Sequence, residues 1–429
     1  MTHAATVAAE SPNRHLAANL LNDPRGQIAA DRFARTVGHR REKTLLKVLY
    51  LVPNLADPAV GRRIDMMSAG GAQVAVAGFQ RANTPAPDLN VDVSIKLAET
   101  FDARFAQRVL AVLQARGEIT RRVGSIPVPD VIIARNLEML ALASRLQAFW
   151  PSRPPIVYEC LDIHRLMLRN DVIGRAMRGA EQYWTRKASL LITSSPAFLR
   201  NYFDIHGAPA AMLIENKVLD YAGARGINPA LAGDVTGPIR IGWFGALRCR
   251  RSLEALAQFM TRMQGRFEVI LRGRPALTEF DDFHGFVDAQ PHMRFEGPYR
   301  NPEELAGIYS QVHFAWAIDF FEAGLNSQWL LPNRIYEGCL HGAVPIALEG
   351  TETAAFIGRH EIGITLPDIE PETLAARIGA FSMPQVTDLA RVVAATDTAH
   401  FVHRESDCHT LVQRLRELCA PRAILTEAA

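Results

Sequence analysis

The sequence has no long hydrophobic run: none approaches the roughly 18 residues that a helix needs to cross a bilayer. We therefore expect no membrane-spanning helix. The first residues also lack a basic segment followed by an apolar one, so we expect no secretory signal. The formal net charge is only +2 over 429 residues, and so weak a charge gives no indication of a nucleic-acid partner.

Cysteine is also scarce, with five residues and no Cys-x-x-Cys pair among them. That spacing fits neither a zinc site nor a disulfide framework and is typical of a reducing compartment, so we expect a cytoplasmic protein.

Two further motifs are missing. No Gly-x-Gly-x-x-Gly follows the apolar run at 48–52, which disfavours a Rossmann dehydrogenase. No Asp-x-Asp pair ends a predicted strand, and we expect neither a metal ion nor a cofactor.

Two series of short apolar segments, each alternating with helical patterns, are present instead. A length of 429 residues fits two domains. Continuous apolar strands closed by loops are typical of parallel sheets that are buried on both faces. The pattern predicts an α/β protein with two doubly wound Rossmann-like domains that face a central cleft. The expected strands lie at 48–52, 74–77, 131–133, 156–158, 190–193 and 212–214 in the first half, and at 239–244, 269–271, 293–295, 312–318 and 344–347 in the second.

Changes in composition divide the chain further. Residues 1–44 hold few large apolar side chains, and we expect a mobile basic arm there. The six basic residues between 32 and 47 either contact an anionic surface or belong to a solvated tail. We expect an N-terminal domain at 45–222 and a C-terminal domain at 237–385, joined by a linker rich in Gly, Ala, Pro and Asp. Helices in 386–429 should pack back across this linker.

One candidate ligand loop follows the strand at 239–244. Gly245 ends that strand, and Arg248, Arg250 and Arg251 stand around the start of the next helix. Free N–H groups at a helix N-terminus attract anions, and guanidinium groups grip pairs of oxygen atoms. The loop is therefore a candidate diphosphate site, with a solvated basic turn as the alternative.

A second candidate site follows Pro332, which suits the first turn of a helix. Asn333, Arg334 and Glu337 lie at the start of this helix, at the sheet edge where ligands bind. A carboxylate such as Glu337 can accept hydrogen bonds from the ribose hydroxyls of a nucleotide. Compensation of the helix dipole is the alternative reason for a glutamate in this place.

These segments resemble the donor site of GT-B glycosyltransferases, particularly those of family 4. The likeness rests on Pro332-Asn333-Arg334 with Glu337, a glycine five residues further on and then a proline-containing strand. Residues 242–245 and 295–299 resemble two more signatures of that family, in matching order and spacing. The resemblance implies a GT-B enzyme that transfers a hexose with retention of configuration at the anomeric carbon. The donor would be a nucleoside-diphosphate sugar on the C-terminal domain, and the acceptor a saccharide or a lipid-linked molecule on the N-terminal domain.

The resemblance also implies that Arg248 and Arg251 lie near the diphosphate and that Glu337 binds the ribose. The sequence departs from the family at one position: members with two glutamates place the first of them eight residues before the second, where this chain has Trp329. Glu322 and Asn326 are the candidates for reading the sugar instead, which leaves the donor sugar open. The expected donor-binding residues are Gly245, Arg248, Arg251, Glu322, Asn326, Asn333, Arg334 and Glu337.

A third loop, at 159–164, ends the strand at 156–158 and should face the cleft from the N-terminal domain. We predict that His164 contacts hydroxyls of the transferred sugar and that Asp162 orients His164 or acts as a base. The alternative is that both side chains only fix the loop backbone.

The segment after the first strand is the candidate acceptor or phosphate loop. Gly61 allows close backbone approach, and Arg62 and Arg63 suit an anionic group. The two arginines, the glycine pair at 70–71 and residues 78–81 resemble bacterial exopolysaccharide glycosyltransferases of the group that includes the succinoglycan enzymes. This likeness implies polysaccharide synthesis, with peripheral contact at the inner face of the membrane. A sugar-nucleotide epimerase of the same double-domain plan and a catalytically inactive, glycosyltransferase-like binding subunit are the alternatives.

Overall fold

The computed structural model of the chain describes residues 45–81, 89–100, 117–220, 225–233, 236–321 and 323–420. The predicted basic arm at 1–44 therefore lies outside the described residues, and so does Glu322. From Leu46 onward the chain forms one unit by its internal contacts, and this unit contains two parallel sheets.

The first sheet has seven strands in the order β3-β2-β1-β4-β5-β6-β7, all parallel. Every residue of the central strand β1 except Lys47 is buried, because alternate side chains of this apolar run enter cores on both faces of the sheet. The strand order reverses between β1 and β4, and doubly wound sheets bind ligands beyond the carboxyl ends of strands at such a point. The strands are β1 (Leu46–Val52), β2 (Ala72–Arg81), β3 (Val93–Thr100), β4 (Val131–Arg135), β5 (Ile156–Cys160), β6 (Ala188–Thr193) and β7 (Ala211–Leu213).

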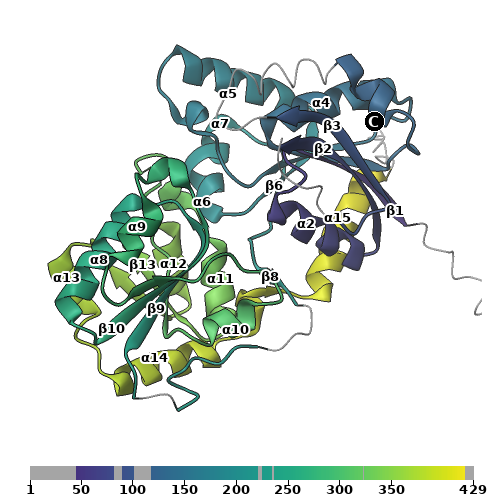
Figure 1. The fold of residues 1–429 in the computed structure, drawn as a ribbon. Coiled ribbons are helices and arrows are strands. Elements are labelled where there is room, and N and C mark those ends of the chain that lie inside the picture. Colours follow the sequence, from purple (N-terminus) through teal and green to yellow (C-terminus); the bar gives the residue numbers. More distant parts are fainter. Residues whose placement is uncertain are drawn as a thin grey trace, which may run out of the picture. The chain divides into compact units, whose positions relative to one another are not determined.

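Helices cover both faces of the first sheet (Figure 1). On one face, Leu142 and Leu146 of α4 enter a core with the side chain of Leu49. On the other face, Ile64 of α2 and Leu411 of α15 pack together, although they come from opposite ends of the chain. The helices and turns of this half are α2 (Pro58–Ala69), α4 (Asn136–Phe149), η2 (Arg165–Leu168), α5 (Val172–Thr185), α6 (Pro196–Phe198), η3 (Leu199–Phe203) and α7 (Asp204–His206).

The second sheet has six parallel strands in the order β11-β10-β9-β12-β13-β14. Its strands are β9 (Ile239–Leu247), β10 (Phe267–Pro275), β11 (Met293–Phe295), β12 (Phe314–Trp316), β13 (Val344–Leu348) and β14 (Ile364–Leu366). Its helices and turns are α8 (Arg250–Met263), η4 (Leu277–Glu279), α9 (Phe283–Asp288), α10 (Leu305–Tyr309), η5 (Ser327–Trp329), α11 (Asn333–Leu340), α12 (Glu352–Arg359), α13 (Pro371–Arg377) and α14 (Met383–Ala395). On α8, the periodic side chains Leu253, Leu256, Phe259 and Met260 are buried against this sheet, as a 3.6-residue period requires. The two sheets confirm the predicted α/β class with two Rossmann-like halves.

The last segments of the chain belong to different cores. Val386 and Ala390 of α14 are buried with the second sheet. The chain then passes through η6 (Thr398–His400) and β15 (Val402–His403), which pairs with β8 (Val218–Leu219), before α15 (Glu405–Cys419) packs on the first sheet. The domain boundaries drawn from composition stay a prediction. Within the described ranges, no helix is both long and apolar enough to cross a membrane.

Candidate functional site

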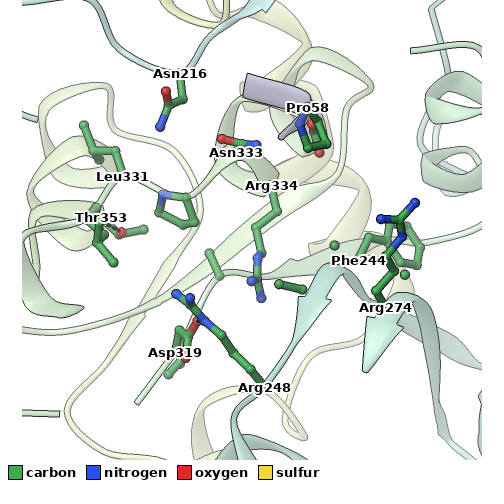
Figure 2. Close-up of a pocket in the computed structure, with 18 of the residues that line it drawn as sticks. Pro58, Asn216, Phe244, Arg248, Arg274, Asp319, Leu331, Asn333, Arg334 and Thr353 are labelled. Carbon is green, nitrogen blue, oxygen red and sulfur yellow. Dashed lines mark hydrogen bonds and ion pairs between the residues drawn. The ribbon is translucent and has the colours of Figure 1, made fainter. Parts of the chain in front are cut away.

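A cavity of about 870 Å³ lies at the carboxyl ends of the second sheet. The ends of β9, β10 and β12 form its wall on one side, and the first turns of α11 form another. The half of the chain that holds the first sheet adds Pro58 and Asn216 to the lining (Figure 2), and it also adds Arg62. This is the edge at which open α/β sheets bind ligands.

Helix α11 brings three of the predicted donor residues to this cavity: Asn333, Arg334 and Glu337. The helix begins directly after Pro332, whose backbone is extended, so the helix axis starts at the cavity wall. Pro332 is therefore the residue before the first turn, one position earlier than the sequence predicts, because its fixed φ also suits an extended cap.

Glu337 is a buried carboxylate with partners on two sides. Asn301 donates a hydrogen bond from Nδ2 to Oε1 of Glu337 over 2.8 Å. Burial raises the pKa of Glu337, and the positive charges of Arg62 and Arg334 act in the opposite direction. A carboxylate held in this way can accept further hydrogen bonds from ligand hydroxyls.

Arginine side chains give the cavity its positive charge. Arg248 pairs through Nε with Oδ2 of Asp319 at 3.1 Å, and its guanidinium lies 4.5 Å from the centroid of the Phe321 ring. Arg334 is buried and directs Nη1 to the carbonyl of Trp316 at 3.4 Å. Figure 2 shows Arg248 and Arg334 directed toward the same part of the cavity. Two guanidinium groups in this arrangement suit the oxygen atoms of a diphosphate.

Arg251 does not line the cavity, although the sequence assigns it to the same diphosphate site. Its Nη2 lies 3.6 Å from Oε1 of Glu370, and its guanidinium covers the ring of Phe320. The reason is helical geometry: Arg248 precedes α8, whereas Arg251 lies in its first turn and points to another side. Arg274 takes a place in the cavity wall that the sequence analysis does not assign, at the end of β10.

Gly245 lines the cavity and is needed for its shape. Its φ is +108°, a value that other residues rarely adopt, and it pairs with Gly273 on β10, whose φ is +131°. A Cβ atom on Gly273 would lie 1.9 Å from the carbonyl oxygen of Gly245. The close approach of β9 and β10 therefore requires glycine at position 273, whereas position 245 favours glycine because of its positive φ.

The two adjacent arginines of α2 have different surroundings. Arg62 lines the cavity, as expected for a residue that meets an anionic group. Arg63 is buried, pairs through Nε with Oε1 of Glu159 at 2.6 Å and is absent from the cavity lining, and its contact with an anionic group stays a prediction. Gly61 is absent from the lining, and a Cβ atom added to it would meet only the side chain of Leu89, at 3.9 Å.

Glu159 is the centre of a buried charge cluster. It accepts hydrogen bonds from Nε of Arg63, Nε of Arg135 (2.8 Å) and the hydroxyl of Tyr50. Burial alone would raise its pKa, but Arg135 and Arg63 outweigh burial and lower the pKa of Glu159 to about 2. Arg135 also pairs with Asp57 at 3.2 Å, and Asp57 caps α2 through the N–H of Ala59. The cluster therefore holds the start of α2, and with it Arg62, at the cavity.

A smaller cavity of about 400 Å³ lies at the ends of β1, β4 and β5. Asp162 lines it, together with Asp57 and Arg62. His164 lines neither cavity: its Nδ1 accepts a hydrogen bond from the N–H of Leu166 over 3.3 Å and caps η2. The loop-fixing alternative thus has direct support, while the catalytic role of His164 stays a prediction.

Asn326 and Trp329 connect the two halves of the chain. Asn326 is buried and donates from Nδ2 to Oδ1 of Asp162 and to the carbonyl of Ile163, both at 2.6 Å. Trp329 packs its ring edge-on against Phe198, and its carbonyl accepts from the hydroxyl of Ser195. Asn326 lies outside the lining of both cavities, whereas Ser327 and Gln328 next to it line the larger one. Trp329, where some family members have a glutamate, takes part in packing.

The described part of the chain holds no group of three or more His, Cys, Asp or Glu side chains that could bind a metal ion. Asn301, Arg274 and Asp57 are site residues that the sequence analysis does not identify. Arg274 follows Gly273 at the end of an apolar strand, and that position was a signal for it. The contact of Asn301 with α11 depends on a loop that is distant in sequence and has no such signal.

The chain is similar to known proteins in both sequence and fold. The chain is 52% identical over 388 residues to the succinoglycan biosynthesis protein ExoL of Rhizobium meliloti (strain 1021), an alignment that covers 89% of this chain and 96% of ExoL. Sucrose-phosphate synthase from Thermosynechococcus elongatus has a similar fold, with a TM-score of 0.64, 15% identity, and coverage of 87% of this chain and 99% of its own. Anabaena HepE, in complex with UDP and glucose, has a TM-score of 0.60, 16% identity, and coverage of 87% and 98%. No protein-family model matches the chain.

Proposed function

Because this chain belongs to the family of the succinoglycan biosynthesis protein ExoL, we propose that it is a glycosyltransferase of bacterial polysaccharide synthesis that uses a nucleoside-diphosphate sugar. The predicted GT-B fold and the predicted likeness to the succinoglycan group are confirmed. Membership of family 4 stays a prediction. The observation that carries the proposal is the cavity in which the buried carboxylate of Glu337 and the guanidinium groups of Arg248 and Arg334 meet.

The donor would lie across the carboxyl ends of the second sheet. Glu337 accepts hydrogen bonds from the ribose hydroxyls, and Asn301 keeps its carboxylate oriented. Arg248 and Arg334 pair with the diphosphate, and Gly245 lets the diphosphate approach the backbone. HepE, which shares the fold, was crystallised with UDP and glucose, and this supports a nucleotide-sugar donor for the present chain.

The transfer breaks the bond between the anomeric carbon and the diphosphate, and it forms a bond from that carbon to the oxygen of an acceptor hydroxyl. The hydroxyl proton passes to the departing nucleoside diphosphate. Negative charge builds on the departing diphosphate. Arg248 and Arg334 stand where they can stabilise this charge without moving, and Arg62 adds a third positive group from α2. Retention of configuration at the anomeric carbon is what the family resemblance implies.

The acceptor, a saccharide or a lipid-linked saccharide, would enter from the first sheet. The smaller cavity supports this placement because Asp57, Asp162 and Asn216 offer polar groups for sugar hydroxyls there. Asn216 and Arg62 line both cavities, so donor and acceptor would be neighbours. Peripheral contact with the inner membrane face is part of the same proposal.

Release of UDP or GDP from a panel of nucleotide sugars tests this function. We expect one donor to be consumed slowly in water and faster with a saccharide acceptor. Glu337→Ala should lose this turnover, and Glu254→Ala should keep it because Glu254 is exposed on α8 outside the cavity. A donor that is converted to its epimer without release of the diphosphate would favour the epimerase alternative. Tight UDP binding with no turnover for any donor would favour the inactive binding subunit.

A further inference from the structure

Helix α5 presents large apolar side chains to solvent. The exposed fractions are 70% for Val172, 50% for Ile173 and 55% for Tyr183. At about 100° per residue, these three side chains lie within an arc of about 100° of the helix circumference, and Ala176 and Ala180 fill the same arc. Single exposed apolar residues are ordinary, but a continuous stripe of them on one helix marks an interaction surface.

The inward side of α5 is mixed: Met177 and Trp184 pack, half-buried, against the core of the first sheet, and polar groups lie beside them. Glu181 faces inward and accepts a hydrogen bond from the hydroxyl of Tyr158 at 2.7 Å and another from Tyr202. Gly174 and Thr185 are the other buried residues of the helix. The apolar stripe therefore faces away from the core of the protein.

Helix α7 lies beside α5 and carries another exposed apolar side chain. Gln182 donates from Nε2 to the carbonyl of His206 over 3.0 Å, which places α7 beside the last turns of α5. Ile205 of α7 is 67% exposed. We call the exposed side chains of Val172, Ile173, Ala176, Ala180 and Tyr183 the α5 face.

Basic residues border the α5 face. Between residues 165 and 187 the chain has six basic side chains and two acidic ones. Of the two acids, Glu181 is buried, and Asp171 is paired with Arg169. Asp204 on α7 is a further exposed acid beside this region. Arg175 and Arg186 are exposed about 40–60° around the helix from Val172, on one flank of the stripe.

An aromatic and basic cluster stands at the C-terminal end of α5. Nζ of Lys187 lies 4.6 Å from the ring centroid of Tyr183 and 4.5 Å from that of Trp184. Apolar side chains flanked by Arg and Lys, with Tyr and Trp at the boundary, are typical of helices that lie in a membrane interface. The positive flank suits anionic headgroups, since basic side chains are attracted to such a surface.

We propose that the α5 face docks this protein on a bilayer that carries anionic headgroups. The inference rests on the proposed function, because it supplies the surface that a lipid-linked acceptor would require. Helix α5 begins shortly after the loop that ends β5, and Asp162 of this loop lines the smaller cavity. Docking through α5 would thus keep the saccharide of a lipid-linked acceptor close to that cavity.

Co-sedimentation of the full chain with vesicles tests the inference. We expect binding to vesicles of phosphatidylcholine mixed with phosphatidylglycerol, weak binding to phosphatidylcholine alone, and a loss of binding at high salt. The double variant Val172→Asp/Ile173→Asp should bind the anionic vesicles at least about tenfold more weakly. Leu277→Asp is the matched control, since Leu277 is 62% exposed in η4, far from α5 in sequence, and its replacement should leave binding unchanged.

Nucleotide release in solution separates this inference from the proposed function. The α5 face lies outside the lining of both cavities, so the double variant should hydrolyse the donor as fast as the parent. A parent protein that binds anionic vesicles but releases no nucleotide would refute the function and not the docking surface. Equal vesicle binding by parent and double variant would overturn the docking surface. The docking surface would also be overturned if the parent bound neither kind of vesicle. It would be overturned as well if the parent were a dimer, the double variant a monomer, and this change of oligomeric state the only difference between them.

Discussion

Nδ2 of Asn301 donates to Oε1 of Glu337 over 2.8 Å and joins the loop after β11 to the first turns of α11. One oxygen of a buried carboxylate is thereby held in place, while the carboxylate still lines the cavity. Burial raises the pKa of Glu337, and the positive charges of Arg62 and Arg334 oppose this rise only in part. The chain thus prepares a hydrogen-bond acceptor at the donor site before any nucleotide arrives.

Replacement of Glu337 by alanine should weaken the binding of UDP or GDP by about 1–3 kcal/mol, the free energy of a lost hydrogen bond to a charged group. Titration calorimetry of both nucleotides measures this loss. Glu254→Ala serves as the control and should bind like the parent. Equal nucleotide affinity in Glu337→Ala and the parent would show that Glu337 does not bind the ribose.

Arg248 and Arg251 should differ in their effect on the diphosphate. Arg248→Ala should weaken the binding of UDP by about 1–3 kcal/mol, because the guanidinium of Arg248 lines the cavity. The affinity for uridine, which has no diphosphate, should be almost unchanged. Arg251→Ala should change UDP affinity by less than about 0.5 kcal/mol, as is usual for an exposed side chain away from a site. The assignment fails if Arg251→Ala costs as much as Arg248→Ala, or if uridine and UDP weaken equally.

His164 should contribute to turnover beyond its role as a cap. His164→Asn retains a side-chain oxygen that can cap η2, so its melting temperature should match that of the parent. If the imidazole contacts the transferred sugar, turnover of this variant should fall by roughly 10²–10⁴-fold while UDP affinity stays constant. His164→Ala should lose both the cap and the turnover. If His164→Asn kept nearly full turnover, His164 would serve only to cap η2 and fix the loop backbone.

Glu159→Gln should destabilise the protein by about 3–5 kcal/mol near neutral pH, because Arg63 and Arg135 would lose their buried counter-charge. The pKa of Glu159 is lowered on folding from its ordinary 4.5 to about 2. Its contribution to stability is therefore complete above pH 4.5 and is lost as the pH falls toward 2. Thermal unfolding across this range should show the parent and the variant converging in acid. A constant gap down to pH 2 would contradict the charge cluster as the cause.

Much of the fold could be predicted because its strands are continuous apolar runs. The edge strand β3 is absent from the prediction, since its side chains are mostly half-buried or exposed and its pattern is weak. In the site, Arg248 and Glu337 could be predicted from their places at a strand end and a helix start. The separation of Arg62 from Arg63 could not, because it depends on which of two adjacent side chains faces the buried Glu159. The position of Trp329 likewise depends on Phe198, which is distant in sequence.

The return of α15 to the first sheet has a consequence for the time at which this protein can fold. Its residues Leu411 and Leu415 cover the same face as Ile64 and Met67 of α2. A Cβ atom on Gly70, at the end of α2, would lie 2.2 Å from the carbonyl oxygen of Cys408, so the two helices are in close contact. During synthesis, that face stays uncovered until α15 has left the ribosome. The first sheet is thus synthesised before the second sheet but receives its last covering helix after it. Until then a chaperone could bind its exposed apolar face.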